Sequence, residues 1–212
     1  VAVIGAGYVG IPTAVTLAVV GHRVILAERD PHRLGVLRAG KSPIHEPGLE
    51  ALLQECLDDG SLRCVGSAVE AVHDAHVTFL CVPTPQGEDG SADLSYVVAT
   101  AQEISEALQP GSIVVNKSTV PVGTAQMVER ALGRSDIAVV SNPEFLREGN
   151  AVDDFLRPSR VVVGGDDSRA VEAVAALYQA TGAPVVSCDA TSAETIKYAA
   201  NAFLATKRSE ER

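Results

Sequence analysis

The first ten residues, VAVIGAGYVG (residues 1–10), decide how this chain folds. A short apolar run is followed at once by three glycines, Gly5, Gly7 and Gly10, in the spacing GxGxxG. That order predicts a β-strand, a tight turn and the start of a helix. Gly5 permits the turn, Gly7 lets the backbone approach a pyrophosphate, and Gly10 lets the helix pack closely against the strand. The helix N-terminus then presents free N–H groups and a positive dipole end to phosphate.

An acid follows at the position that such a fold uses to bind a ribose. Glu28 ends the second predicted strand, 18 residues after Gly10, where a carboxylate accepts hydrogen bonds from an adenosine ribose diol. A carboxylate there repels a 2′-phosphate, so the pattern favours NAD over NADP. Arg29 and Arg33 leave the alternative open, because either could pair with such a phosphate. We expect Arg33 either to contact the adenosine side or to be a solvated charge.

Short β-branched runs alternate with longer Ala- and Leu-rich runs along the chain. Several short runs are continuous in Val and Ile, which indicates burial on both faces, as in a parallel sheet covered by helices. The pattern therefore predicts an α/β fold with a doubly wound, mostly parallel, Rossmann-like sheet. The predicted strands are residues 1–5, 23–28, 62–65, 76–82, 112–118, 137–142, 160–164 and 184–188, and the predicted helices include residues 10–20, 94–108, 124–132 and 167–181.

Two segments interrupt this alternation of strands and helices, and one helix follows the last strand. Residues 40–60 hold KSPIHEPGLEALL, a turn marked by Pro that leads into a helix. Residues 142–159 hold NPEFLREGNAVDDFLRPS, a long and charged connection, and long ordered loops are often functional. Residues 192–206 are predicted to form one amphipathic helix, because apolar residues recur there at helical spacing. These apolar residues are Ala193, Ile196, Ala200 and Phe203.

The composition narrows the kinds of partner. The 212 residues are 46% hydrophobic, 21% charged and only 4% aromatic, which indicates a globular protein with an aliphatic core. The formal net charge of -10, without a Lys/Arg block, argues against nucleic acid and an anionic membrane as partners. No apolar run reaches membrane-spanning length. The four cysteines form no CxxC pair, so we expect neither a zinc site nor a disulfide framework, as in a cytoplasmic protein.

Later motifs go beyond the glycine fingerprint. Taken together and in order, they resemble the UDP-glucose/GDP-mannose dehydrogenase family over nearly the whole chain, and NPEFLREG leans towards the UDP-glucose branch. The matching segments are GAGYVG (5–10), HEPGL (45–49), CVPTP (81–85), NKSTVPVGT (116–124), NPEFLREG (142–149) and ETIKYAANAFLATK (194–207).

The resemblance implies an NAD-dependent enzyme that oxidises the C6 alcohol of a nucleotide sugar twice, through an aldehyde, to a carboxylate. Two NAD are consumed and no metal is needed. The second oxidation passes through a cysteine thiohemiacetal and a thioester, which water cleaves. The expected reaction is UDP-glucose to UDP-glucuronate. GDP-mannose and UDP-N-acetyl-sugar 6-dehydrogenases remain the alternatives within the enzyme class.

The resemblance also assigns cofactor contacts. Thr84 and Thr119 each follow a predicted strand at the edge where α/β sheets bind ligands. For Thr84, the alternative is that Pro83 and Pro85 simply shape a turn around it. The family uses Thr119 to hold a catalytic water or the sugar hydroxyl, and the alternative is that Thr119 caps the next helix. The full set of implied NAD contacts is Gly5, Gly7, Tyr8, Val9, Gly10, Glu28, Arg33, Thr84, Thr119 and Glu148.

Four residues receive catalytic roles from the resemblance, Thr119 among them. Glu144 is the base that activates water for thioester hydrolysis, and it would share a face with Glu148 if their segment were helical. Lys197 and Asn201 lie four apart on the last predicted helix, and a cation and an amide on one face suit an oxyanion at C6. The implied substrate-binding residues are Phe145, Leu146, Arg147, Glu148, Lys197 and Asn201.

Three arginines are candidates for binding the substrate diphosphate. Arg147 lies within NPEFLREG, but Arg157 and Arg160 fit equally well by sequence.

The sequence departs from the family pattern in two respects. The family's catalytic cysteine lies in a GGxCxPKD-like motif in its second half, and this sequence has no such motif; Glu28 replaces the usual Asp. We therefore expect residues 1–190 to form the NAD-binding domain and residues 191–212 the truncated start of a central connecting helix, without the second, catalytic domain. Because family members pair through that helix, we expect a homodimer of the full-length protein. The alternative class is an NAD-binding module that does not catalyse.

Overall fold

The computed structural model describes residues 1–87 and 90–210, and within these ranges eight strands form one sheet. All eight predicted strands are confirmed, each within two residues at either end. The strands are β1 (Ala2–Ile4), β2 (Val24–Ala27), β3 (Leu62–Val65), β4 (Val77–Leu80), β5 (Ile113–Asn116), β6 (Ala138–Ser141), β7 (Val161–Gly164) and β8 (Val185–Cys188).

The order of the strands confirms the doubly wound fold. The sheet runs β3-β2-β1-β4-β5-β6-β7-β8, and the first six strands in this order are parallel. Their carboxyl ends therefore meet at one edge, with the change of winding direction between β1 and β4, where such sheets bind ligands. β7 pairs antiparallel with β6 through Ser141 and Gly164, and β8 runs parallel to β7.

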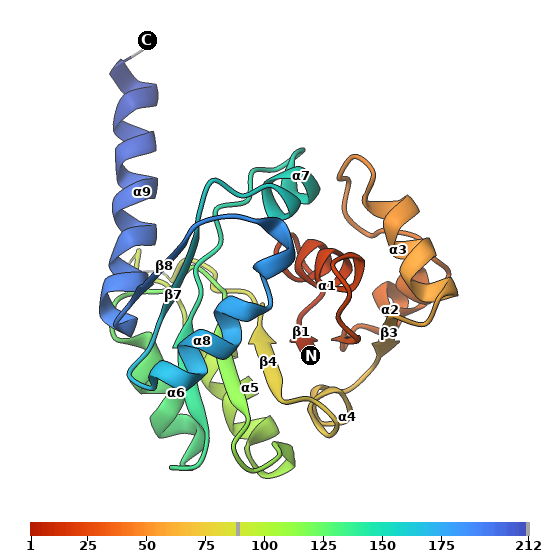
Figure 1. Ribbon diagram of the computed structural model, residues 1–212, viewed down its shortest axis with the longest axis horizontal. Coiled ribbons are helices and arrows are strands. Elements are labelled where there is room, and N and C mark those ends of the chain that lie inside the picture. The colour runs from red at the N-terminus through yellow and green to blue at the C-terminus, as the bar shows by residue number, and fades with distance from the viewer. Residues whose placement is uncertain (88–89, 211–212) are drawn as a thin grey trace.

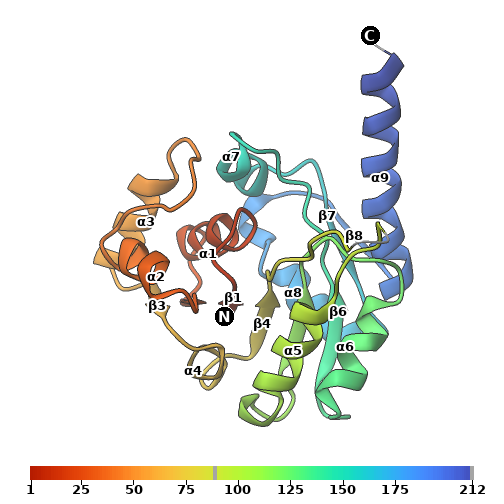
Figure 2. The same cartoon turned by 180° about the vertical axis from the view of Figure 1, so that it is seen from behind.

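Helices cover both faces of the sheet (Figures 1 and 2). The largest fully buried side chains are Leu, Ile and Val with a single Phe, Phe79, so the core is aliphatic as the composition predicts. One face packs against α1 (Gly10–Val19), α2 (Pro31–Arg38), α3 (Leu49–Asp58), α7 (Ala151–Leu156) and α8 (Ser168–Ala176), and the other against α4 (Ala68–Val72), α5 (Ser95–Ile104) and α6 (Thr124–Leu132).

Some helix boundaries differ from the predictions. α5 and α8 are shorter than the predicted residues 94–108 and 167–181, because each gives way to a 3-10 turn, at Ser105–Ala107 and Gln179–Thr181. The predicted helices left out α2, although its start carries two sequence signals. Asp30 caps it by accepting a hydrogen bond from the Arg33 N–H at 2.8 Å, and a proline occupies its first turn.

The connection over residues 142–159 contains α7 and is otherwise irregular. Residues 142–149 are not helical, so the condition under which Glu144 and Glu148 would share a helical face is not met. Two local features favour the irregular path. The Glu144 carboxylate accepts the N–H of Leu146 at 2.6 Å, and Gly149 has a φ of +82°, which interrupts a right-handed helix.

The last helix, α9 (Ala190–Glu210), is longer than predicted. Its base is fixed to the sheet domain by Glu194, whose carboxylate accepts the N–H groups of Gly123 at 2.6 Å and Ala125 at 2.8 Å at the start of α6. Further along, α9 projects away from the other elements (Figures 1 and 2). Phe203 is 69% exposed there, so part of the predicted apolar stripe is uncovered. No helix in the described ranges is long and apolar enough to cross a membrane.

Candidate cofactor and substrate site

A cleft of about 690 Å³ opens at the carboxyl ends of β1, β2 and β4. Most of the cofactor contacts predicted from sequence line it. Gly10 and the exposed Glu148 are not among the described residues that line the cleft. The predicted residues that do line it are Gly5, Gly7, Tyr8, Val9, Glu28, Arg33, Thr84 and Thr119.

The glycine turn gives this cleft its shape. Gly5 has a φ of +98°, and a Cβ built on it would lie 2.6 Å from the carbonyl oxygen of Cys81. A Cβ on Gly10 would collide with the carbonyl oxygen of Gly5, whereas one on Gly7 would meet no atom within 4 Å. No side chain caps the start of α1 in the described structure. The first N–H groups of α1 and the open space beside Gly7 therefore fit a diphosphate.

Glu28 and Arg33 form an ion pair at the ribose end of the cleft. Glu28 is 9% exposed; its carboxylate accepts the Asp30 N–H at 2.9 Å and the Arg33 Nε–H at 3.2 Å. Arg33 also donates to the carbonyl of Ala6, so two partners hold it in the cleft lining, where its side chain is 37% exposed. Arg29 instead pairs with Glu103 of α5 at 3.6 Å.

Thr84 and Thr119 meet at the end of the cleft near β5. The Thr84 hydroxyl donates to the Thr119 carbonyl at 3.0 Å, so the two loops after β4 and β5 are tied together. The alternative that Thr119 caps the next helix is excluded, because the residue at the N-cap of α6 is Gly123.

A second group of residues surrounds an ion pair between Glu144 and Lys197. The Lys197 Nζ donates to Glu144 Oε1 at 2.8 Å, and the two side chains are only 9% and 10% exposed. Lys197 also lies 5.4 Å from the centroid of the Phe145 ring, and the Arg160 guanidinium lies 4.6 Å from it. The pair brings α9 against a loop 53 residues earlier in the chain. Asn201, one turn further along α9, is exposed.

A buried cluster that was not predicted from the sequence lies close to this group, with Lys117 in electrostatic range of Glu144 and Lys197. Lys117, 4% exposed, donates to Asn142 Oδ1 at 3.1 Å and to the Tyr178 hydroxyl at 3.2 Å. Asn142 in turn donates to the carbonyl of Val162 at 2.7 Å. Burial lowers the pKa of Lys117 to about 8. The available signal was a lysine directly after the apolar strand run ending at Asn116, a position that predicts burial.

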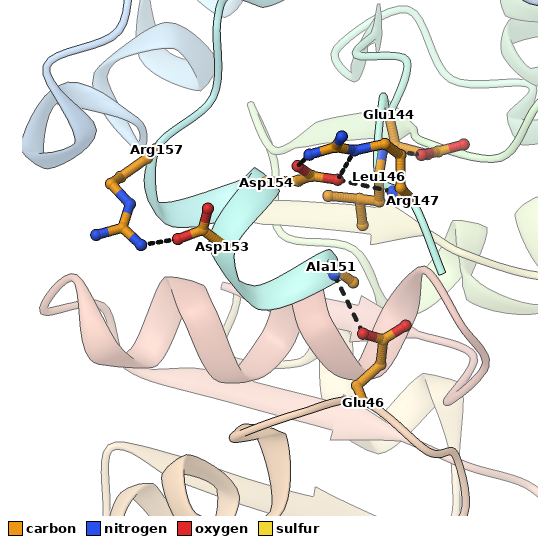
Figure 3. Close-up of polar contacts among 8 residues, drawn as sticks. All are labelled: Glu46, Glu144, Leu146, Arg147, Ala151, Asp153, Asp154 and Arg157. Carbon is orange, nitrogen blue, oxygen red and sulfur yellow. Dashed lines mark hydrogen bonds and ion pairs between the residues drawn. The ribbon is translucent and has the colours of Figure 1, made fainter. Parts of the chain in front are cut away.

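The loop residues predicted to bind substrate have different surroundings (Figure 3). Leu146 packs against the core. Arg147 is 71% exposed, and its guanidinium makes two hydrogen bonds to Asp154, at 3.0 and 2.6 Å. Arg157 pairs with Asp153 on the exposed side of α7. Of the three candidate arginines, Arg160 is therefore the one that contacts the same aromatic ring as Lys197.

Cys81 lies where the two groups of residues adjoin. It follows β4, lines the cofactor cleft and is 7% exposed, rather than lying inside the strand as expected. Burial raises the pKa of the Cys81 thiol to about 12. The charge of Lys117 lowers this pKa and the charge of Glu144 raises it, so both groups lie within electrostatic range of Cys81.

The other three cysteines are not activated either. Burial raises the pKa of Cys64 to about 11 and also raises those of Cys56 and Cys188. In the described ranges, no three side chains of His, Cys, Asp or Glu converge to hold a metal ion.

Comparisons with known proteins agree with this geometry. The family model for the NAD binding domain of the UDP-glucose/GDP-mannose dehydrogenase family matches residues 1–181. UDP-glucose 6-dehydrogenase of Pseudomonas aeruginosa is 50% identical over 220 residues, which cover 97% of this chain and 48% of that protein.

Two solved structures superimpose closely. A UDP-glucose dehydrogenase from Pyrobaculum islandicum matches with a TM-score of 0.93 and 44% identity, over 96% of this chain and 49% of that one. A ternary complex of GDP-mannose dehydrogenase from Pseudomonas aeruginosa gives a TM-score of 0.91 at 36% identity, over 97% and 50%. The chain spans about half the length of the curated relatives it matches. It belongs to the UDP-glucose/GDP-mannose dehydrogenase family, as an NAD-binding domain whose cofactor is NAD.

Proposed function

We propose that the full-length protein oxidises a nucleotide sugar at C6, converting UDP-glucose to UDP-glucuronate, and that this chain supplies the NAD cleft and one wall of the catalytic site. The observation that carries the proposal is the buried Glu144–Lys197 pair, with its 2.8 Å contact, within electrostatic range of Cys81, which lines the cofactor cleft. We call residues 142–151 together with Lys117 and Lys197 the catalytic wall.

In the first oxidation, the C6 hydroxyl loses its proton to water, and NAD, which Gly5, Gly7 and Glu28 would hold in the cleft, would supply the hydride acceptor. The Lys197 ammonium and the Asn201 amide stabilise the alkoxide that develops at C6, because a cation and an amide donor on one face of α9 favour a developing negative charge. Thr119 holds the sugar hydroxyl or a water from the neighbouring loop. Its place in the cleft lining supports this role.

The second oxidation needs a thiolate that adds to the aldehyde carbon, after which a second NAD would accept the hydride and leave a thioester. None of the four cysteines of this chain is suited to that step, because burial raises the pKa of each and the thiolate is the nucleophilic form. The thiolate therefore comes from outside this chain. Glu144 takes the proton of the water that cleaves the thioester, so that the acid and the free thiol are released.

The substrate is oriented by the loop that carries Glu144. Phe145, Leu146, Arg147 and Glu148 line the nucleotide-sugar site. Glu148 is exposed and lies outside the lining of the cofactor cleft, so it is not given a cofactor contact. Arg147 is held by Asp154, so a substrate diphosphate would compete with a carboxylate for it. Within the described part of the chain, Arg160 forms no ion pair with a carboxylate, so it is the stronger candidate for the diphosphate.

In the full-length protein, α9 pairs with the same helix of a second copy. The half of α9 that projects from the sheet exposes Tyr198 by 43%, Phe203 by 69% and Leu204 by 51%, which is more apolar surface than a solvated helix needs. Sedimentation analysis of the full-length protein and of Phe203→Asp tests this. A wild-type dimer that becomes a monomer in the variant is expected, and a wild-type monomer would contradict it.

The activity is tested by incubating the full-length protein and NAD with UDP-glucose, UDP-N-acetyl sugars and GDP-mannose in parallel. NADH absorbance and mass spectrometry of the acid report turnover, and two NADH for each UDP-glucuronate are expected. Faster turnover of another nucleotide sugar would move the enzyme to that branch of the family. No NADH with any sugar, despite NAD binding, would favour a non-catalytic module.

A further inference from the structure

The HEPGL segment contains a buried acid that has no part in the cofactor cleft. Glu46 is 6% exposed, and its carboxylate accepts the N–H of Gly149 at 2.8 Å and the N–H of Ala151 at 3.1 Å. Figure 3 shows the Ala151 contact at the start of α7. These partners lie 103 and 105 residues later in the chain. Glu46 therefore links the turn before α3 to the end of the loop that carries Glu144.

The turn around Glu46 is itself firmly placed. Ile44 is 7% exposed and Leu49 is fully buried, so the segment is anchored in the core on both sides of the acid. The Ser42 hydroxyl donates to the Ile44 carbonyl at 2.7 Å, and Gly48 supplies the left-handed conformation, with φ +77°, at the start of α3. Glu46 thus projects from a fixed base.

The loop it reaches is held at both of its ends, and the Glu144–Lys197 pair holds it between them. At its beginning, Asn142 is bonded to Lys117, Tyr178 and Val162. At its end, the Glu46 carboxylate accepts the N–H groups of Gly149 and Ala151 and so attaches the loop to a distant segment of the chain. A buried carboxylate without partners would be strongly disfavoured, but two charge-assisted hydrogen bonds and the positive end of α7 stabilise it here.

We propose that Glu46 is a positioning residue for the catalytic wall: its carboxylate fixes residues 149–151 and thereby keeps Glu144 and Phe145 turned towards Lys197. The consequence for catalysis rests on the function proposed above, whereas the clamp itself does not. Glu46 touches neither the cofactor cleft nor the reacting atoms. Its loss should therefore affect use of the nucleotide sugar and leave NAD binding unchanged.

The first test measures amide hydrogen exchange in this chain for wild type, Glu46→Gln and Glu50→Gln. A carboxamide keeps the shape but has only one accepting oxygen, so at least one of the N–H groups of Gly149 and Ala151 should exchange roughly ten-fold faster in Glu46→Gln. Glu50 is the matched control, because it is an acid on the adjoining helix whose bonds are local, to Lys41 and Ser42. Unchanged protection of both amides in Glu46→Gln would overturn the clamp.

The second test uses the full-length enzyme. Glu46→Gln should raise KM for the nucleotide sugar and lower kcat by roughly ten-fold, with KM for NAD unchanged. Glu46→Asp, which keeps the charge on a shorter arm, should recover part of the loss and also serves if Glu46→Gln folds poorly. Equal changes in both KM values, or no change in either, would overturn the positioning role. A wild-type enzyme that oxidises no sugar would refute the proposed function instead, and the exchange measurement would still decide the clamp.

Discussion

The cofactor cleft and the catalytic wall are built in different ways. The cleft depends mainly on short-range sequence: the glycine turn and Glu28 all lie within the first 28 residues, and Arg33 pairs with an acid only five residues away. The catalytic wall is assembled by contacts across long stretches of chain, such as Lys197 to Glu144 over 53 residues and Lys117 to Tyr178 over 61. The cleft is therefore built largely from residues close together in the sequence, whereas the wall depends on tertiary packing between distant segments.

The largest difference between the two regions should appear in turnover. This chain alone, with NAD and UDP-glucose, is expected to bind NAD but to form no UDP-glucuronate, because positioning is worth many orders of magnitude in rate and no thiolate is available. NADH absorbance and mass spectrometry of the product acid measure it. Sustained turnover that survives Cys→Ser at all four cysteines would contradict the assignment, and turnover lost with one of them would identify that cysteine as the nucleophile.

The next largest effect should follow from breaking the buried pair in the wall. Lys197→Met leaves Glu144 as an uncompensated, nearly buried charge and should lower the free energy of unfolding by about 3 kcal/mol. The double variant with Glu144→Gln should cost less than the sum of the two single changes. Denaturant unfolding measures all three.

The exposed Lys41–Glu50 pair, at 3.0 Å with side chains 66% and 50% exposed, provides the control for that experiment. Lys41→Met should change stability little, because solvent screens the charges of exposed pairs. If Lys197→Met were no more damaging than Lys41→Met, the wall would not be held by this ion pair.

The buried lysine of the wall should give stability a distinctive pH dependence. The pKa of Lys117 is about 8 in the folded protein against an ordinary value of 10.5. Between these values the unfolded chain binds a proton that the folded chain does not, so this lysine makes stability rise with pH. From about pH 7.5 to 9.5 the rise due to Lys117 should be about 2 kcal/mol.

Comparison with Lys117→Met isolates that contribution. The groups nearest to Lys117 that also titrate are Cys81, Glu144, Tyr178 and Lys197, and they are present in both proteins. The difference in unfolding free energy between wild type and variant should therefore grow in favour of wild type as the pH rises. A difference that stays constant over this range would mean that Lys117 keeps its ordinary pKa.

The sequence predicted the cleft far better than the wall. GAGYVG and Glu28 carry their geometry in local spacing, and continuous Val/Ile runs mark each strand. The direction of β7 is not readable in this way, because Val161–Gly164 has the same apolar character whether it runs parallel or antiparallel. The short helix α7 is likewise hidden, because six residues give too little periodicity and its start is stabilised by the distant Glu46. Lys117 carried a signal in its position after a buried strand, but its partners Asn142 and Tyr178 come from elements that only the fold brings together.

The smallest expected effect concerns cofactor choice in the cleft. The wild-type chain should bind NAD more tightly than NADP, because the Glu28 carboxylate repels a 2′-phosphate and also holds Arg33 by its 3.2 Å ion pair. Glu28→Ser removes the repulsion and frees this guanidinium for a phosphate. The ratio of the two dissociation constants should then shift towards NADP by about ten-fold, which corresponds to about 1.4 kcal/mol.

Calorimetry with both cofactors distinguishes repulsion from recruitment of the arginine. If Arg33 supplies the gain in NADP affinity, the double variant Glu28→Ser/Arg33→Met should lose most of that gain. The part that comes from removing the repulsion by Glu28 should remain as a smaller shift towards NADP. Arg29→Met on the Glu28→Ser background is the matched control, because Arg29 pairs with Glu103 on α5 and not with Glu28. NADP binding by the wild type as tight as NAD binding would show that the arginines already outweigh the carboxylate, and that even the locally encoded region depends on how its charges are paired in the folded chain.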